Sequence, residues 1–392
     1  GKCVVAGNVR RSAEIALGDP TDLDFILCKQ NEEKLYSHRW ASNNSVFAKK
    51  GLDYSFIADQ IAVNGEPGIF WLDNARAYSR MGDDPDYKDK KAAGVNPCGE
   101  QTLESFELCC LVETFPSRHD SYEEFQESLK YAYLYAKSVT LVNTHWKETN
   151  AVMLKNRRMG ISQTGIIEAF VRHGRRKVLD WCQKAYKYLK DLDETYSDWL
   201  CIPKSIKVTT VKPSGTVSLL PGVTPGIHYP HSKYYIRRIR ISKNSDLIAP
   251  IKAAGYHVED DEYSPNTVVA EFPVHEEFFD RDKNEVSIWE QAQNAADYQK
   301  YWSDNQVSVT VTFQKEEAGE IKRVLECFED KLKSISFLPI KEHGYKQAPY
   351  EEITKDEFEE KVKDLKPLNL EKTQDKAIGE KFCDSDKCEV SF

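Results

Sequence analysis

An amide, a thiol and a carboxylate lie close together in the stretch Asn96-Pro97-Cys98-Gly99-Glu100, and two more thiols, Cys109 and Cys110, follow it. The glycines and the proline in and just before this stretch predict a tight, irregular loop over residues 94–100. A loop of this kind can present its side chains to one ligand instead of placing them in a helix-packing stripe. The competing interpretation is that the three cysteines are small buried hydrophobic residues, because free cysteine is among the most buried residue types.

A second stretch that could bind a ligand is the run Pro213-Ser214-Gly215-Thr216-Val217-Ser218. It follows a segment rich in β-branched residues, 207–212. Its small residues predict a turn that exposes backbone N–H groups and hydroxyls, a combination that binds an anion where such a turn opens a helix. The run lacks the glycine pattern of a P-loop or of a dinucleotide-binding fingerprint. An ordinary strand-to-helix turn is therefore the alternative.

Three further residues attract attention near the chain ends. Arg10 lies in a predicted turn with Arg11, where a guanidinium group suits either solvent or a phosphate or base. Cys383 and Cys388 lie in a polar segment. Three interpretations of this pair are open: a structural disulfide, half of a zinc site, or a redox pair. Because a full zinc site usually has four ligands, we favour a thiol pair that exchanges with another disulfide.

Helices and short strands alternate along the chain and must position these residues. Apolar residues at helical spacing predict helices, over residues 53–64, 122–142, 176–200, 287–301 and 316–337. Apolar, β-branched or alternating runs predict strands, at residues 13–17, 69–72, 207–212, 234–241 and 307–313. This alternation is typical of an α/β sheet or barrel.

The composition of the chain is that of a globular protein. Of its 392 residues, 40% are hydrophobic and 30% charged, so a large core is available. The net charge of −9 argues against a nucleic-acid partner bound mainly by charge. No apolar run is long enough to span a bilayer, and the ten cysteines are too sparse for a disulfide scaffold. We therefore expect reduced thiols, a cytoplasmic location and no membrane partner.

Together these motifs resemble the catalytic chain of ribonucleotide reductase. The resemblance rests on the stretch 96–100 with a cysteine at 109, the turn Lys212–Ser218, the opening Gly7-Asn8-Val9-Arg10-Arg11-Ser12-Ala13 and the terminal cysteine pair. The greatest similarity is to the adenosylcobalamin-dependent, class II reductases that act on ribonucleoside triphosphates.

The resemblance implies a role for each site residue. Cys98 would carry a transient thiyl radical, Glu100 would act as general base for the 3′-hydroxyl, and Asn96 would orient the substrate hydroxyls. Cys109 would be one of two reducing thiols, whereas Cys110, Cys28, Cys182, Cys201 and Cys327 would be structural.

The same resemblance assigns roles to the remaining motifs. The turn from Pro213 to Ser218 would hold the substrate phosphates, and Arg10 would belong to a specificity loop that responds to a nucleotide effector. Cys383 and Cys388 would reduce the active-site disulfide and would be recharged by a thioredoxin-like protein.

The fold implied is part of a ten-stranded α/β barrel of the ribonucleotide reductase and glycyl-radical type, with the radical-cysteine loop at its centre. Residues 1–345 would be the C-terminal portion of the barrel, with the radical loop at about 94–110 and the phosphate-binding turn at about 212–218. Residues 346–392 would be a polar, mobile tail with the redox pair. The family's second reducing cysteine lies upstream of any residue here, so we expect a fragment or one half of a split enzyme that cannot turn over alone.

The radical source is adenosylcobalamin by resemblance and by elimination. Residues 333–339 contain no tyrosine pair of the kind that receives a radical from a partner subunit, and residues 380–392 contain no glycine for a glycyl radical. We expect no metal ligands. Two alternatives stay open: a large-subunit chain of a two-subunit, metal-radical ribonucleoside-diphosphate reductase, and an inactive nucleotide-binding fragment.

Overall fold

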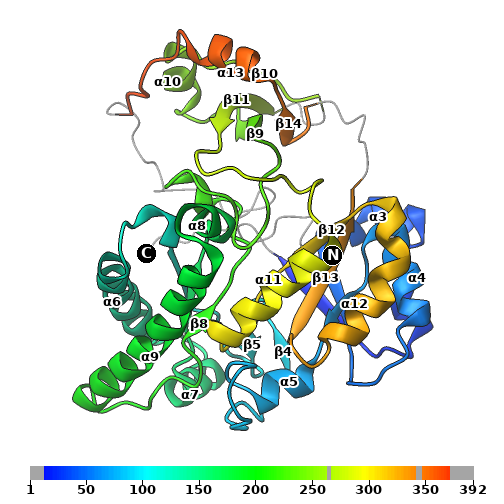
Figure 1. Cartoon of the computed structure of the whole chain (residues 1–392), viewed down its shortest axis with the longest axis vertical. Helices are drawn as coiled ribbons and strands as arrows, with labels where there is room; N and C mark the ends of the chain where they lie inside the picture. The colour runs from blue at the N-terminus through cyan, green and yellow to red at the C-terminus, as the bar shows by residue number, and fades with distance from the viewer. Residues whose placement is uncertain (1–12, 263–265, 341–346, 371–392) are drawn as a thin grey trace. The chain divides into compact units, whose positions relative to one another are not determined.

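The computed structural model describes residues 13–262, 266–340 and 347–370, and they divide into two compact units (Figure 1). The larger unit contains residues 13–229 and 284–340, and the smaller unit contains residues 230–283 and 347–370. Arg10, Cys383 and Cys388 lie outside the described residues. The predicted boundary at residue 345 stays a prediction. The grouping of residues 230–283 with residues beyond 340 in one unit was not predicted.

The elements of the larger unit alternate between helix and strand. In chain order they are β1 (Glu14–Gly18), α2 (Leu23–Ile26), α3 (Glu32–Ser37), β2 (Ser42–Phe47), α4 (Ser55–Asn64), β3 (Gly68–Phe70), α5 (Leu72–Ala77), β4 (Gly94–Val95), β5 (Thr102–Leu103), β6 (Leu111–Thr114), α6 (Tyr122–Val139), α7 (Lys147–Asn156), β7 (Gly160–Gln163), α8 (Ile166–His173), α9 (Arg175–Trp199), β8 (Thr209–Thr210), α11 (Ile288–Tyr301), β12 (Thr310–Phe313), α12 (Ile321–Phe328) and β13 (Ser334–Pro339). Short 3-10 helices lie between them, η1 (Arg39–Ala41), η2 (Pro116–Arg118), η3 (Val217–Leu219) and η4 (Lys315–Glu320).

Two sheets and a hairpin organise the larger unit. Five strands have the order β1-β2-β3-β13-β12, in which only the β3–β13 pair is antiparallel. Three parallel strands have the order β6-β7-β8, and β4 pairs with β5 as an antiparallel hairpin. Parallel pairing with intervening helices confirms the predicted α/β class. The described strands form open sheets and not a closed barrel.

The long helices begin where side chains cap them. The Ser121 hydroxyl accepts from the N–H of Glu124 at the start of α6, and Ser287 does the same for Glu290 at the start of α11. Helix α6 buries Phe125, Leu129 and other apolar residues of one face against α9, which explains why the pattern predicted both helices almost to the residue.

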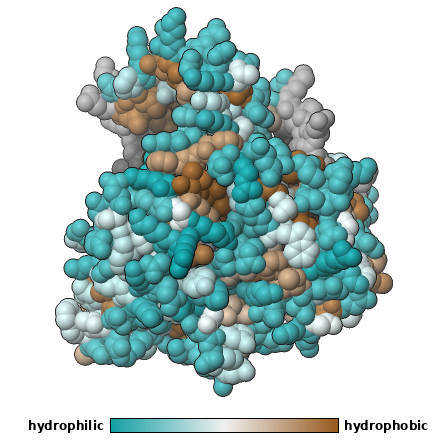
Figure 2. All heavy atoms as spheres, viewed as in Figure 1, coloured by the Kyte–Doolittle hydropathy of each residue, from teal (hydrophilic) through white to brown (hydrophobic). Residues whose placement is uncertain are grey.

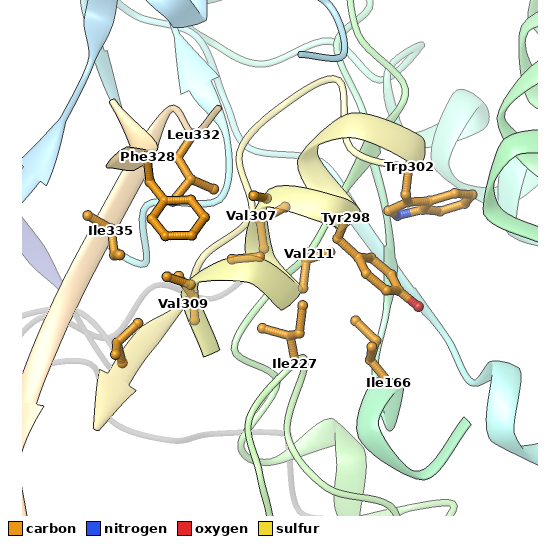
Figure 3. Packing of buried hydrophobic residues seen from close by; sticks show 14 of the residues in the cluster. Ile166, Val211, Ile227, Tyr298, Trp302, Val307, Val309, Phe328, Leu332 and Ile335 are labelled. Carbon is orange, nitrogen blue, oxygen red and sulfur yellow. The ribbon is translucent and has the colours of Figure 1, made fainter. Parts of the chain in front are cut away.

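One apolar core joins the helices and strands of the larger unit. Figure 3 shows part of it, with side chains from segments far apart in the sequence: Ile166, Val211, Ile227, Tyr298, Trp302, Val307, Val309, Phe328, Leu332 and Ile335. Trp302 is fully buried, and its indole N–H donates to the carbonyl oxygen of Thr210 at 2.8 Å. The core therefore fixes the segment that leads to the turn at 213–218.

The predicted helix over residues 316–337 is wrong in its second half. Helix α12 ends at Phe328, and Ser334–Pro339 form strand β13 between β12 and β3. The apolar spacing changes from helical to alternating at this point, because Ile335 and Phe337 are the buried residues of the strand. The prediction combined two periods into one helix.

The smaller unit is an antiparallel sheet with two helices. Its elements are β9 (Tyr234–Ser242), α10 (Ile248–Ala253), β10 (Val258–Asp260), β11 (Thr267–His275), β14 (Tyr350–Glu352) and α13 (Lys355–Val362), with strand order β10-β11-β9-β14. Arg238 of β9 forms ion pairs with Glu271 of β11 and Glu351 of β14. Strand β14 and helix α13 thus lie in the segment predicted to be a polar tail.

The surface is mostly hydrophilic on the face that Figure 2 shows. In the described part of the chain, no helix combines the length and the apolar character needed to cross a membrane.

Candidate active site

Cys98 lies at the tip of the β4–β5 hairpin. The loop is closed by Asn96, whose N–H donates to the carbonyl oxygen of Gln101 at 3.1 Å and whose side-chain Oδ1 accepts from the N–H of Gln101 at 2.9 Å. Gly99 has a φ of +77°, a left-handed conformation that residues with a side chain rarely adopt. The predicted tight loop is therefore present. The amide oxygen of Asn96 shapes it, and a role for Asn96 toward substrate stays a prediction.

Neighbouring segments hold this loop by its main-chain carbonyls. Asn43 of β2 donates from Nδ2 to the carbonyl oxygen of Pro97 at 2.9 Å, and the Ser308 hydroxyl donates to that of Cys98 at 2.7 Å. The carbonyl oxygen of Glu100 accepts from the hydroxyl of Thr210 at 2.6 Å. The position of the Cys98 thiol is therefore set by contacts from both sides of the loop.

The thiol of Cys98 and the carboxylate of Glu100 share one cationic neighbour. The Nζ of Lys212 lies 3.0 Å from Oε1 of Glu100 and 3.8 Å from Sγ of Cys98. Glu100 is fully buried, and its second oxygen, Oε2, has no hydrogen-bond partner among the described residues. An ion pair with one unengaged carboxylate oxygen is thus placed beside an exposed thiol.

Both exposed thiols of the site are held in their protonated form. Burial raises the pKa of the Cys98 thiol, and the negative charge of Glu100 raises it further, while Lys212 opposes both effects. The same groups act in the same directions on the pKa of Cys109, again with burial first. Each side chain keeps exposed surface although protein surrounds most of it. Near neutral pH the two groups are therefore accessible S–H groups and not thiolates.

The two adjacent cysteines after the loop have different surroundings. Cys109 is exposed and lies within the electrostatic reach of Cys98, Glu100 and Lys212. Cys110 is buried in the apolar core, where burial, and then the charge of Glu107, raises its pKa to about 11. Cys109 therefore lies near the Cys98 loop, whereas Cys110 is a packing residue of the core.

The turn at 213–218 leads directly from Lys212 into η3. Ser214 adopts a left-handed φ of +51°, and its carbonyl oxygen accepts from the N–H of Ser218 at 3.1 Å. Gly215 and Thr216 are exposed, and their backbone N–H groups, with that of Val217, make no hydrogen bond to another described residue. The turn thus offers free donors, as an anion-binding turn must.

A half-buried acid on the neighbouring strand β6 supports this turn. The Ser214 hydroxyl donates to Oε1 of Glu113 on β6, whose other oxygen has no partner in the described chain. Burial raises the pKa of Glu113 to about 7, although hydrogen bonds from Ser214 and Ser162 oppose the rise. Glu113 therefore changes its charge within the neutral pH range.

A cavity of about 320 Å³ adjoins the loop within the larger unit. Its wall combines the loop with strands β2, β3, β12 and β13, and its lining includes Asn43, Ser45, Pro97, Cys98, Gly99, Pro213, Ser308, Thr310, Ser336 and Phe337. Hydroxyl and amide groups next to a reactive thiol suit a polar ligand of the size of a nucleoside.

A buried ion network fixes the segment between the loop and Cys109. Arg158 is fully buried and makes a bidentate pair with Asp89, at 2.7 and 2.8 Å, while its Nε donates to Glu107 at 3.0 Å. Lys207 also pairs with Asp89 at 3.0 Å. Since Glu107 lies two residues before Cys109, this network anchors the main chain that carries the second thiol.

Sequence reasoning missed the parts that Lys212, Glu113 and Ser308 play. Lys212 belonged to a recognised motif, and its position before a small-residue turn was the available signal. Glu113 and Ser308 had none, because their contacts join distant segments. The expectation that Cys201 and Cys327 are packing residues is wrong, since both are exposed.

Comparison with known proteins supports the resemblance stated above. The chain is 52% identical to a protein of Dictyostelium discoideum described as a probable adenosylcobalamin-dependent ribonucleoside-triphosphate reductase, with 100% of this chain and 53% of that protein aligned. It is 47% identical to the adenosylcobalamin-dependent ribonucleoside-triphosphate reductase of Euglena gracilis, over 99% of this chain and 55% of the relative. No family model matches the chain.

A solved structure agrees with these relatives. The crystal structure of a B-12 dependent, class II ribonucleotide reductase superposes with a TM-score of 0.84 at 36% identity, over 91% of this chain and 54% of that one. The chain spans about half the length of the curated relatives it matches. It belongs to the adenosylcobalamin-dependent, class II family of ribonucleotide reductases.

Proposed function

We propose that a protein containing this chain reduces ribonucleotides, with ribonucleoside triphosphates as the preferred substrates, to 2′-deoxyribonucleotides through a thiyl radical on Cys98. The observation that supports this most directly is the contact of Lys212 with Glu100 and with Cys98, whose side chain lines the cavity. A protonated thiol is the form that exchanges a hydrogen atom, and a carboxylate is the form that accepts a proton. The site holds one of each.

The proposed cycle uses the side chains of the site in order. The Cys98 thiyl removes the 3′-hydrogen atom of the ribose and becomes S–H, while Glu100 accepts the proton of the 3′-hydroxyl. The 2′-hydroxyl then takes up a proton and leaves as water. Cys109 and a second thiol supply two electrons and two protons, one proton to the departing water and one to the 2′-carbon, and become a disulfide. Glu100 returns its proton to the 3′-oxygen as Cys98 returns its hydrogen atom to the 3′-carbon.

The turn at 213–218 is the proposed phosphate site, because its free N–H groups follow directly on Lys212. Asn96 is the residue proposed to orient the sugar hydroxyls, as the resemblance implies. Glu113 holds Ser214 and so shapes the turn.

The cavity at Cys98 allows a test of the fit of adenosylcobalamin. Its 320 Å³ and its amide and hydroxyl lining fit a nucleoside-sized group, so Asn43, Ser308 and Thr310 would hold the adenosyl end, whereas the much larger corrin ring would need surface outside this cavity. When bound, adenosylcobalamin supplies the radical that converts the Cys98 thiol to a thiyl.

Several partners complete the proposal. The second reducing thiol comes from a part of the protein outside this chain. A nucleotide effector acts through the loop that contains Arg10, and Cys383 and Cys388 transfer electrons from a thioredoxin-like protein to the site disulfide. The absence of disulfides among the described cysteines is compatible with the cytoplasm as the location.

The test is reduction by the full-length protein. With a ribonucleoside triphosphate, adenosylcobalamin and dithiothreitol, the wild type should form the deoxyribonucleotide, Cys98→Ser should form none, and Glu100→Gln should be slower by about 100-fold. Cys201→Ser is the matched control, because it removes an exposed thiol elsewhere, and it should keep full activity. Product formation by Cys98→Ser, or dependence on a metal-containing partner subunit, would contradict the proposal.

A further inference from the structure

Lys212 is the common neighbour of the three reactive groups of the site. Its ammonium contacts Glu100 and Cys98, and its charge also acts on Cys109. Its backbone is fixed as well: the N–H donates to Oγ of Ser162 at 2.9 Å. A Cβ added to Gly226 would lie 2.5 Å from the Lys212 carbonyl oxygen, so the opposite side is closely packed. Lys212 is thus held in place and not free to follow a ligand.

The ion pair is asymmetric toward Glu100. Lys212 engages Oε1 at 3.0 Å, whereas Oε2, buried and without a partner in the described chain, is left as the acceptor. A fully buried carboxylate without a counter-ion would be strongly destabilised relative to its neutral form. Lys212 therefore supplies the counter-charge at Glu100 and determines which oxygen stays available.

From this geometry we infer that Lys212 is a positioning residue that holds Oε1 of Glu100 and leaves Oε2 directed to accept the proton of the substrate. The inference rests on the proposed function for the identity of that proton. It differs from the simpler idea that a lysine beside a phosphate-binding turn binds the phosphate. The shorter contact, to Glu100, favours the positioning role.

Four charged or titratable groups interact with the ammonium of Lys212 and would be affected by its removal. Cys98 and Glu100 face it from the hairpin loop, Cys109 from the segment before β6, and Glu113 from β6 itself. Burial opposes the ammonium, but the charges of Glu100 and Cys98 outweigh this and raise the pKa of Lys212. It stays positively charged through the neutral range.

The first experiment needs neither cofactor nor substrate. In the full-length protein, the alkylation rate of Cys98 by iodoacetamide is measured between pH 7 and 10, with the site of modification assigned by peptide fragmentation. Lys212→Gln removes the cation that stabilises the thiolate, so at pH 8.5 the rate should fall about tenfold, which corresponds to one pKa unit. Lys212→Arg should stay within about twofold of the wild type. An unchanged rate in Lys212→Gln would overturn the inference.

The second experiment separates positioning from phosphate binding. Lys212→Gln should lower kcat at least 30-fold and leave the KM for the triphosphate within threefold, because the carboxyl group of Glu100 is then no longer held with Oε2 toward the substrate. Lys212→Arg should recover most of kcat. A tenfold rise in KM at unchanged kcat would assign Lys212 to the phosphate and refute positioning.

The two experiments fail in different ways. If the wild-type protein makes no deoxyribonucleotide, the proposed function fails, while the alkylation rates still report whether Lys212 controls the charge at Cys98. If the wild type is active and Lys212→Gln is unaltered in either experiment, the inference alone fails. Lys212→Arg, which keeps the charge, shows that a loss in Lys212→Gln is not a loss of folding.

Discussion

Arg158 is predicted to be one of the most sensitive positions of the larger unit. Its guanidinium is fully buried and binds Asp89 through two nitrogens and Glu107 through Nε. Arg158→Gln removes the charge and leaves two buried carboxylates. Asp89 keeps Lys207, whereas Glu107 keeps only neutral donors, the amide of Asn156 and the backbone N–H of Glu104. We expect a large loss of stability, because Glu107 then has no cationic partner in the described chain.

The size of the loss follows from the burial of the groups. Breaking a buried ion pair by removing one partner typically costs about 3–5 kcal/mol, since the other charge stays desolvated. In a unit of this size that corresponds to a fall in Tm of about 5–10 °C. Arg323→Gln is the matched control: Arg323 pairs with Glu320 on the exposed face near α12, where such a pair contributes at most about 0.5 kcal/mol.

Thermal unfolding of the full-length variants by calorimetry or circular dichroism measures this. The double variant Glu107→Gln/Arg158→Gln should recover about 1–2 kcal/mol relative to Arg158→Gln, because it neutralises the stranded carboxylate while its amide oxygen still accepts from Asn156. A Tm for Arg158→Gln within 1 °C of the wild type would refute the reasoning. So would a double variant that is less stable than the single one.

Two further predictions concern proton and electron transfer. Burial raises the pKa of Glu113 to about 7, so the folded state favours the neutral form of this side chain. Its contribution to the free energy of unfolding therefore falls as the pH rises from about 4.5 to 7 and is constant above that. The total fall is at most about 3 kcal/mol. The Tm of Glu113→Gln should therefore fall less between pH 5 and pH 8 than the Tm of the wild type. Glu127→Gln, at an exposed position, is the control, and an equal fall in Glu113→Gln and the wild type would contradict the prediction. Cys383→Ser should keep turnover with dithiothreitol and lose it with thioredoxin; equal loss with both reductants would refute a shuttle role for the pair with Cys388.

The sequence predicted those elements whose periodicity is set by one buried face. Helices α6, α9 and α11 were located within a few residues, because each has a continuous apolar stripe that packs against the core. Prediction failed at α12 and β13, where two short elements with different periods follow each other, and at β14, whose pairing with β9 joins residues more than a hundred positions apart. The alternation of β9 predicted that strand, but the three-residue strand β14 leaves no local signal of its own.

The residues of the candidate site likewise fall into those that a local sequence pattern predicts and those that it does not. Its hairpin loop and the turn at 213–218 were recognisable because glycine, proline and reactive side chains occur together there. The residues that tune the site were not, since Asp89, Glu107 and Arg158 meet only after folding. Pairwise charge contacts between distant segments have no periodicity, and composition cannot predict them.

The protonation of the thiols restricts how the site disulfide can be reduced. Burial and Glu100 keep Cys98 and Cys109 as S–H groups, a state that suits hydrogen-atom transfer but makes them weak nucleophiles, because the thiolate is the attacking species in disulfide exchange. After each proposed turnover the attack must therefore come from a thiolate outside the site. A cysteine pair on another segment, as proposed for Cys383 and Cys388, meets this need, because its thiols can ionise away from Glu100. The same electrostatics that keep the proposed radical thiol protonated thus favour a separate reducing pair.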